Sequence, residues 1–183
     1  MSMKDVLNNI SRGTRRAGLG DKLDQIITLL NQAKASSNLS MNAAGLVIGS
    51  VSAAKVKITN TVNFLINNAF KSIATQEVAF TATTHDIVAN ASVVREAVYL
   101  LSTNAAGTVV ITMGQIVNGS GNAVVPAVPS ASPSVLGMVR IAVAAGATSF
   151  TAATTLLSNG ALTVTYTDLS MLPLTAPSVD ALT

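Results

Sequence analysis

The sequence contains no cysteine and no tryptophan, and aromatic residues make up only 3% of its 183 positions. Without cysteine, disulfide bonds and thiolate metal sites are excluded. Charged residues are also scarce, at 10% of the chain, where an average soluble domain has about a quarter. The scarcity is greatest from Ala97 to Thr183, where the charged residues are Arg140, Asp168 and Asp180. A surface this poor in charge is suited to lying against another protein.

Long hydrophobic runs are absent as well. The longest candidate, Val135 to Ala145, is interrupted by Arg140 and is shorter than the roughly 18 apolar residues that a membrane-spanning helix needs. The first residues, MSMKD, are polar and predict no signal peptide. We therefore expect a protein that does not enter a membrane.

Candidate catalytic groups are few and scattered. His85 is the single histidine, and we expect a structural role for it, because strand neighbours such as Asp86 point to the opposite face. Arg95 and Glu96 are expected on a solvated strand face, with a pair between subunits as the alternative. The Gly119–Gly121 pair lacks the helix and the acidic residue of a phosphate site and predicts a flexible loop. General acid–base chemistry needs two placed groups with shifted pKa values, so we expect no enzyme activity, cofactor or metal.

Charge is divided unevenly along the chain. Residues 1–71 have nine Lys and Arg and three Asp, a balance of +6, whereas residues 72–183 have two Arg and five acidic residues, a balance of −3. The basic front half predicts an acidic protein partner, with a solvated basic arm as the alternative. No nucleic acid partner is expected, because the basic residues lack interleaved aromatic residues.

The front of the chain has the spacing of two short amphipathic helices. Apolar residues recur at the i, i+3, i+4 and i+7 positions of one helical face in residues 3–10 and again in residues 22–35. A helix of about fourteen residues is marginal alone in water and must dock on something. We predict that residues 1–36 form a basic attachment or oligomerisation arm. Its candidate residues are Arg12, Arg15, Arg16, Leu23, Ile26, Ile27 and Leu30.

After the arm, the apolar period changes from that of a helix to that of a strand. Residues 55–66 place Val56, Ile58, Val62 and Phe64 on one face and mainly polar residues on the other, as in a half-buried strand. Further strands are expected within residues 45–51, 78–80, 95–102, 108–114, 136–143 and 161–169, with a hairpin turn at Asn67-Asn68.

Turn signals separate these strands at intervals of about eight to twelve residues, as they do in sandwiches and barrels. We predict a mainly β protein, an antiparallel β-sandwich or barrel preceded by short N-terminal amphipathic helices. The predicted parts are the arm at residues 1–36, a β-hairpin region at 37–82, a neutral β-sandwich domain at 83–172 and an extended C-terminal tail at 173–183.

Two neutral segments carry a family resemblance. Residues 81–114, TATTHDIVANASVVREAVYLLSTNAAGTVVITMG, and residues 122–150, NAVVPAVPSASPSVLGMVRIAVAAGATSF, resemble segments of virion proteins of tailed bacteriophages. The likeness extends over about residues 46–172. Such decoration, cement or head-fibre proteins tend to join an N-terminal helical or extended attachment region to a neutral β domain rich in Ala, Thr and Val. The resemblance includes no site motif, so it assigns no functional residues.

The resemblance implies a structural component of a phage particle. Such a decoration or cement protein binds the major capsid protein or other virion proteins and stabilises the head lattice through repeated interfaces. It implies a homo-oligomer, with a trimer favoured, that is made in the host cytoplasm and resides in the virion. A tail, baseplate or fibre-base protein is an alternative. A module that binds host surfaces or glycans is another, although such sites usually present Trp or Tyr platforms.

Overall fold

The structure is a computed structural model that describes residues 38–66 and 69–169. The chain divides into two units, residues 1–37 and 38–183. The predicted arm at residues 1–36, the predicted Asn67-Asn68 turn and the predicted tail at 173–183 lie outside the described residues.

The described part of the chain is mainly β, as the sequence predicts, and all of its paired strands are antiparallel. No helix within it has the length and apolar character needed to cross a membrane. The strands are β1 (Leu39–Ser40), β2 (Leu46–Ile48), β3 (Lys55–Ile58), β4 (Val62–Ile66), β5 (Ala69–Ile73), β6 (Gln76–Ala79), β7 (Arg95–Thr103), β8 (Val109–Met113), β9 (Val117–Asn118), β10 (Ser134–Val143) and β11 (Leu162–Asp168).

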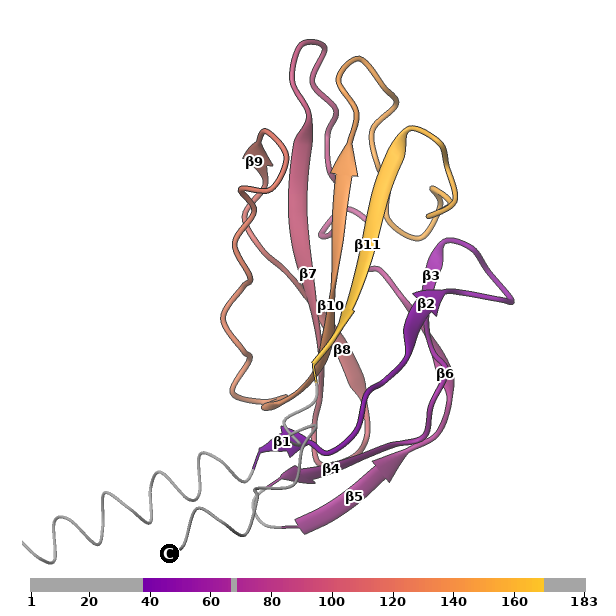
Figure 1. Cartoon of the computed structure of the whole chain (residues 1–183), viewed down its shortest axis with the longest axis vertical. Coiled ribbons are helices and arrows are strands. Elements are labelled where there is room, and N and C mark those ends of the chain that lie inside the picture. Colours follow the sequence, from indigo (N-terminus) through magenta and orange to yellow (C-terminus); the bar gives the residue numbers. More distant parts are fainter. Residues whose placement is uncertain (1–37, 67–68, 170–183) are drawn as a thin grey trace, which may run out of the picture. The chain divides into compact units, whose positions relative to one another are not determined.

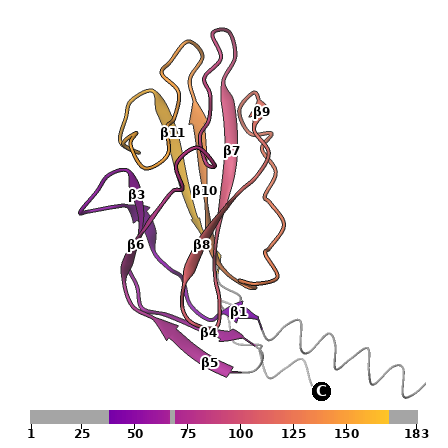
Figure 2. The same cartoon turned by 180° about the vertical axis from the view of Figure 1, so that it is seen from behind.

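The described strands form three sheets (Figures 1 and 2). The largest sheet has the order β11-β10-β7-β8, and β9 pairs with β7 near the start of that strand. A second sheet has the order β2-β3-β6, and a third has the order β1-β4-β5. The two small sheets thus come from the front of the described chain and the large sheet from its rear.

The stretch that predicts one strand over residues 55–66 instead forms β3 and β4, which belong to different sheets. The chain turns between them, where the Thr59 N–H donates to the Ala44 carbonyl oxygen at 3.1 Å and the Thr59 hydroxyl donates to the Gly45 carbonyl oxygen at 2.8 Å. Gly45 has a φ of +65°, and a Cβ there would lie 2.2 Å from Thr59 Oγ1, so glycine is required. The alternation of apolar and polar residues continues across the break, because β3 and β4 both point every second side chain into the same core.

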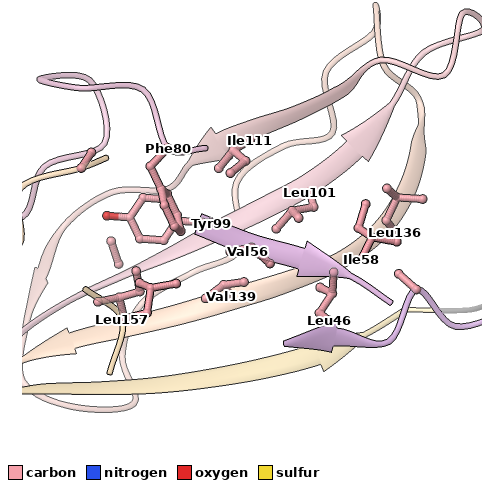
Figure 3. Packing of buried hydrophobic residues seen from close by; sticks show 14 of the residues in the cluster. Leu46, Val56, Ile58, Phe80, Tyr99, Leu101, Ile111, Leu136, Val139 and Leu157 are labelled. Atoms are coloured by element: carbon pink, nitrogen blue, oxygen red, sulfur yellow. The ribbon is translucent and has the colours of Figure 1, made fainter. Parts of the chain in front are cut away.

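Apolar side chains from all three sheets meet in one core (Figure 3). Val56 and Ile58 of β3 face Tyr99 and Leu101 of β7, with Val139 of β10 beside them. The core therefore draws on both predicted regions, 37–82 and 83–172. Its largest fully buried apolar side chains are Tyr99, Phe64, Phe80, Phe150, Ile58, Ile87, Leu101, Leu136 and Ile141.

Strand β7 is buried on both faces, unlike a strand of a sheet with one solvated face. Tyr99 and Leu101 point into the core, while Val98 and Leu100 point to the opposite face and are buried as well. This opposite face is lined by the connection from β9 to β10, which runs alongside β7 away from β2, β3 and β6 (Figures 1 and 2).

Candidate functional site

The connection between β9 and β10, residues 119–133, is the leading candidate for an interaction surface. It contains no charged residue and no strand. Loops longer than about 12–15 residues without secondary structure are uncommon in compact domains and are often functional. Val124 is 71% exposed, and Val125 and Val128 are exposed as well. We call these three residues the valine ridge.

Close main-chain packing holds the valine ridge against the large sheet. The Gly114 N–H donates to the Val98 carbonyl oxygen of β7 at 2.7 Å. A Cβ on Gly114 would lie 2.7 Å from the Val124 carbonyl oxygen and 3.1 Å from that of Val98. Only glycine allows this approach, so Gly114 fixes the depth at which the ridge lies on β7.

A buried ion pair anchors the start of the same connection. The Glu96 side chain is 1% exposed; its Oε2 accepts the Gly121 N–H at 2.7 Å, and its Oε1 lies 2.8 Å from Arg140 Nη1. The Arg140 side chain is 34% exposed, so the pair is buried at its carboxylate end. Removing one partner of a buried pair leaves an uncompensated charge, which is strongly destabilising.

This pairing corrects the expectation for the Arg95-Glu96 dipeptide. Glu96 does not lie on a solvated strand face, and its partner is Arg140 of the same chain. Arg95 donates to the Val88 carbonyl oxygen at 2.9 Å. The physical reason is that the connection between β9 and β10 covers the outer face of β7, so this face is buried. A carboxylate buried there is stable only when a charged group pairs with it.

Two turns of the same geometry form a second distinctive feature. The first turn, FTATTHDI, spans residues 80–87, and the second turn, FTAATTLL, spans residues 150–157. In each, the fourth residue has a left-handed backbone, with φ of 65° at Thr83 and 64° at Ala153. Such values are uncommon for residues other than glycine, so their recurrence at the same position marks one local structure used twice.

The two turns are also closed by the same side-chain bond. The Thr81 N–H donates to His85 Nδ1 at 2.9 Å, and the Thr151 N–H donates to Thr155 Oγ1 at 2.9 Å. In both cases the acceptor side chain lies four residues after the donor. The acceptor is an imidazole in the first turn and a hydroxyl in the second.

The two turns contact each other directly. The rings of Phe80 and Phe150 pack edge to face, with centroids 5.5 Å apart and planes at 85°. Ile87 and Phe150 exchange both main-chain hydrogen bonds, at 2.9 and 3.0 Å. Asp86 Oδ1 accepts the Ala152 N–H at 2.7 Å. The paired turns therefore close one end of the core.

His85 is part of this cluster and has a structural environment, although in a turn and not in the expected strand. It is buried, and its main-chain oxygen accepts the Tyr99 hydroxyl at 2.7 Å. Burial lowers the pKa of His85 below its ordinary value, against opposing effects of the Asp86 carboxylate and the Ile111 backbone. Burial also raises the pKa of Tyr99. Because His85 Nδ1 already accepts a main-chain N–H, it is not free to act as a base.

Each turn borders a shallow surface hollow, and hydroxyl residues line most of the hollow beside the second turn but only part of the hollow beside the first. The hollow beside the first turn also includes His85 and Asp86, whose Nδ1 and Oδ1 atoms accept main-chain N–H groups. The hollow beside the second turn has no charged lining residue. Among the residues that the structure describes, no three His, Cys, Asp or Glu side chains gather as metal ligands would.

The basic residues of the front half are only partly described. Lys55 and Lys57 lie on β3, whereas Lys71 lies on β5 in another sheet. Lys57 stands directly across from Glu77 of β6. The described lysines therefore do not form one patch, and the predicted attachment residues Arg12, Arg15, Arg16, Leu23, Ile26, Ile27 and Leu30 lie outside the described residues.

Comparison with known proteins provides no relative: no family model, no curated protein and no solved structure matches the chain.

Sequence reasoning predicted a flexible loop at Gly119–Gly121 but missed that residues 119–133 cover a sheet. It also missed the paired turns. The signal for the turns was present, because FTATT and FTAATT recur with similar residues in the same order.

Proposed function

We propose that the chain is a structural component of a bacteriophage particle, a capsid decoration or cement protein that binds the head lattice through repeated protein–protein interfaces. One observation carries the proposal: the valine ridge is apolar, uncharged and exposed, and the connection that contains it is anchored at Gly121 by the buried Glu96 carboxylate, which pairs with Arg140. An anchored apolar surface loses less conformational freedom when a partner covers it than a free loop does. The resemblance of residues 81–114 and 122–150 to phage virion proteins supplies the setting.

The architecture that best suits this role is an antiparallel β-sandwich. Strands β3 and β4 of the small sheets and strands β7 and β10 of the large sheet all contribute apolar side chains to one core, which supports this assignment. A sandwich presents its covering connection on a stiff base, which suits a protein that must hold one geometry in many copies.

Binding would be driven by removal of the valine side chains from water. Apolar burial contributes about 25 cal/mol per Å², less the cost of association. In a lattice, each bound copy raises the effective concentration for the next contact. The predicted arm at residues 1–36, with Arg12, Arg15 and Arg16, would supply a second attachment to an acidic surface.

The test is occupancy on particles that lack the protein, measured by electron microscopy after addition of the full chain. Val124→Asp combined with Val128→Asp is expected to abolish binding, because both charges would be buried in the interface. Val51→Asp is the matched control, since Val51 is an exposed valine on a different loop. Unchanged occupancy of the double variant would falsify the role of the valine ridge.

Experiments on the same particles test whether residues 1–36 attach the protein and whether it binds the head or the tail. Deletion of residues 1–36 is expected to reduce occupancy, and full occupancy without them would remove the arm from the proposal. A copy number on the order of hundreds indicates the head lattice, whereas roughly six or twelve copies indicate a tail ring.

A further inference from the structure

Strand β11 is an edge strand whose outer main-chain groups are open. The Ala144 N–H donates to the Ala161 carbonyl oxygen at 3.0 Å, and the Leu169 N–H donates to that of Leu136 at 3.1 Å. Between these bonds the register with β10 is unbroken, and hydrogen-bonded pairs alternate with non-hydrogen-bonded pairs. Thr163, Thr165 and Thr167 therefore turn their main-chain groups towards β10, and the residues between them turn theirs away from the sheet.

The open groups belong to Val164 and Tyr166. Within the described residues, the N–H and C=O groups of these two residues have no hydrogen-bond partner. In Figure 1, β11 lies at the front of the large sheet, and no described segment crosses in front of it. An edge of this kind is a template for another strand.

The middle of β11 has no feature that discourages such pairing. From Leu162 to Thr167 the strand has no charge, proline or bulge, which are among the usual means of blocking an edge. The one charged residue of the strand is Asp168 at its end, whose Oδ1 accepts the Leu46 N–H of β2 at 3.0 Å. The edge strand β5 of the small sheet, by contrast, has the exposed Lys71 at its centre. At the other edge of the large sheet, β8 is shorter than β11; β8 contacts β6, and β11 contacts β2.

The sequence of β11 is complementary to itself. The order Thr163-Val164-Thr165-Tyr166-Thr167 reads almost the same in both directions about Thr165. When two copies pair antiparallel about that residue, Val164 of each copy meets Tyr166 of the other, and these are the residues with open main-chain groups. Both pairs can then exchange their two hydrogen bonds, as a hydrogen-bonded antiparallel pair does.

The side chains match in the same register. On the outer face Thr165 meets its own copy and Thr163 meets Thr167; on the core side Val164 meets Tyr166. Thr–Thr and aromatic–β-branched pairs are favourable across antiparallel strands. The nearest charge on the outer face is Arg140, one strand further in, and it is already paired with Glu96.

We propose that a second copy of this chain occupies the β11 edge, in a two-fold antiparallel pairing centred on Thr165 that joins two large sheets into one continuous sheet. The contact is isologous, so it favours a dimer over the trimer that the phage resemblance implies. It does not depend on the virion role, and failure of particle binding would leave it standing.

Charge placed at the axis tests the pairing in the full chain. The wild type is expected to sediment as a dimer at micromolar concentration. Thr165→Lys and Thr165→Asp should each weaken the dimer by about tenfold or more, because like charges would then face each other. An equimolar mixture of the two variants should recover the dimer, since opposite charges then meet. Val110→Lys, on the opposite edge strand, is the matched control and should leave the dimer intact.

A cross-link gives a second measurement that does not rely on the charged variants. The wild type has no cysteine, so Thr165→Cys creates the sole thiol. Directly opposed residues in a non-hydrogen-bonded pair have Cα atoms about 4.5 Å apart, within the range of a disulfide. Rapid oxidation to a covalent dimer is expected for Thr165→Cys and not for Val110→Cys.

Several results would overturn the proposal. A wild type that stays monomeric, as it would if another part of the chain covered the edge, is one of them. Dissociation caused equally by Val110→Lys is another, and so is a mixture of the two charged variants that fails to associate. A trimer that is insensitive to substitution at Thr165 would also exclude the two-fold contact.

Discussion

The first turn and the second turn have the same backbone geometry but close it with different side chains. Both place a phenylalanine in the core, both have a left-handed residue at the fourth position, and both close with a side chain that accepts a main-chain N–H. The acceptor in the first turn is buried and titratable, whereas the acceptor in the second is a partly exposed hydroxyl. The comparison shows that backbone geometry is shared while the dependence on pH is confined to one turn.

The largest loss of stability is expected from removing the phenylalanine that each turn places in the core. Phe80→Ala and Phe150→Ala should each lower the free energy of unfolding by about 3–5 kcal/mol, because each leaves a cavity where the two rings meet. Urea denaturation of both variants measures this. A large loss for one phenylalanine and none for the other would show that the turns are not equivalent in the core.

The second-largest loss of stability should come from removing the acceptor side chain, and it should differ between the two turns. His85→Ala is expected to cost about 2–4 kcal/mol, because it removes a buried ring and leaves the Thr81 N–H without its acceptor. Thr155→Ala should cost only about 0.5–1 kcal/mol, because the Thr151 N–H lies where water can replace the hydroxyl. Thermal unfolding of the two variants gives the contrast; equal costs would contradict the role of burial.

The third expected effect is a dependence of folding stability on pH that comes from His85. Burial lowers the pKa of His85 in the folded protein below its ordinary value of 6.5, so the unfolded chain binds the proton more readily. Stability is therefore fully present above that ordinary value and declines as the pH falls through it towards the folded pKa. The slope cannot exceed about 1.4 kcal/mol per pH unit for one group.

Exchange of the acceptor provides the control for this third effect. His85→Thr gives the first turn the acceptor of the second, and the decline in stability between neutral and mildly acidic pH should shrink. Chemical denaturation at several pH values measures it. An unchanged slope in the variant would assign the dependence to other groups.

The smallest effect concerns the left-handed residues. Thr83→Gly should change stability by less than about 1 kcal/mol, because the relief of left-handed strain is offset by a more flexible unfolded chain. Ala153→Gly should be less favourable than Thr83→Gly, because a β-branched residue is more strained in this conformation. Calorimetry of the pair tests the order, and the reverse order would show that the Thr83 hydroxyl, which donates to the Ala82 carbonyl oxygen at 2.6 Å, stabilises the turn by more than the strain costs.

Much of the fold followed from periodicity. The strands predicted near residues 95–102, 108–114, 136–143 and 161–169 correspond to β7, β8, β10 and β11, because alternation and β-branched residues act locally. The break between β3 and β4 could not be predicted in this way, since both strands bury the same parity of side chain. The bond between Thr59 and Gly45 that fixes the break joins distant parts of the sequence.

The candidate site was less accessible from the sequence. The loop at Gly119–Gly121 and the lack of charge around it could be predicted, but the burial of Glu96 could not, because it depends on Gly121 and Arg140, which come from two other segments. The open edge of β11 could not be inferred either. Whether a strand is central or at an edge is decided by the order of strands in the sheet.

By itself, the sequence determined that the described part would be β-rich, poor in charge and free of thiol chemistry, since these follow from composition and from alternation between neighbouring residues. Only the tertiary structure decided which neutral residues face water, which carboxylate is buried and which strand is left without a partner. The physical reason is that exposure, ion pairing and sheet edges arise from contacts between segments far apart in the chain, which no local pattern encodes.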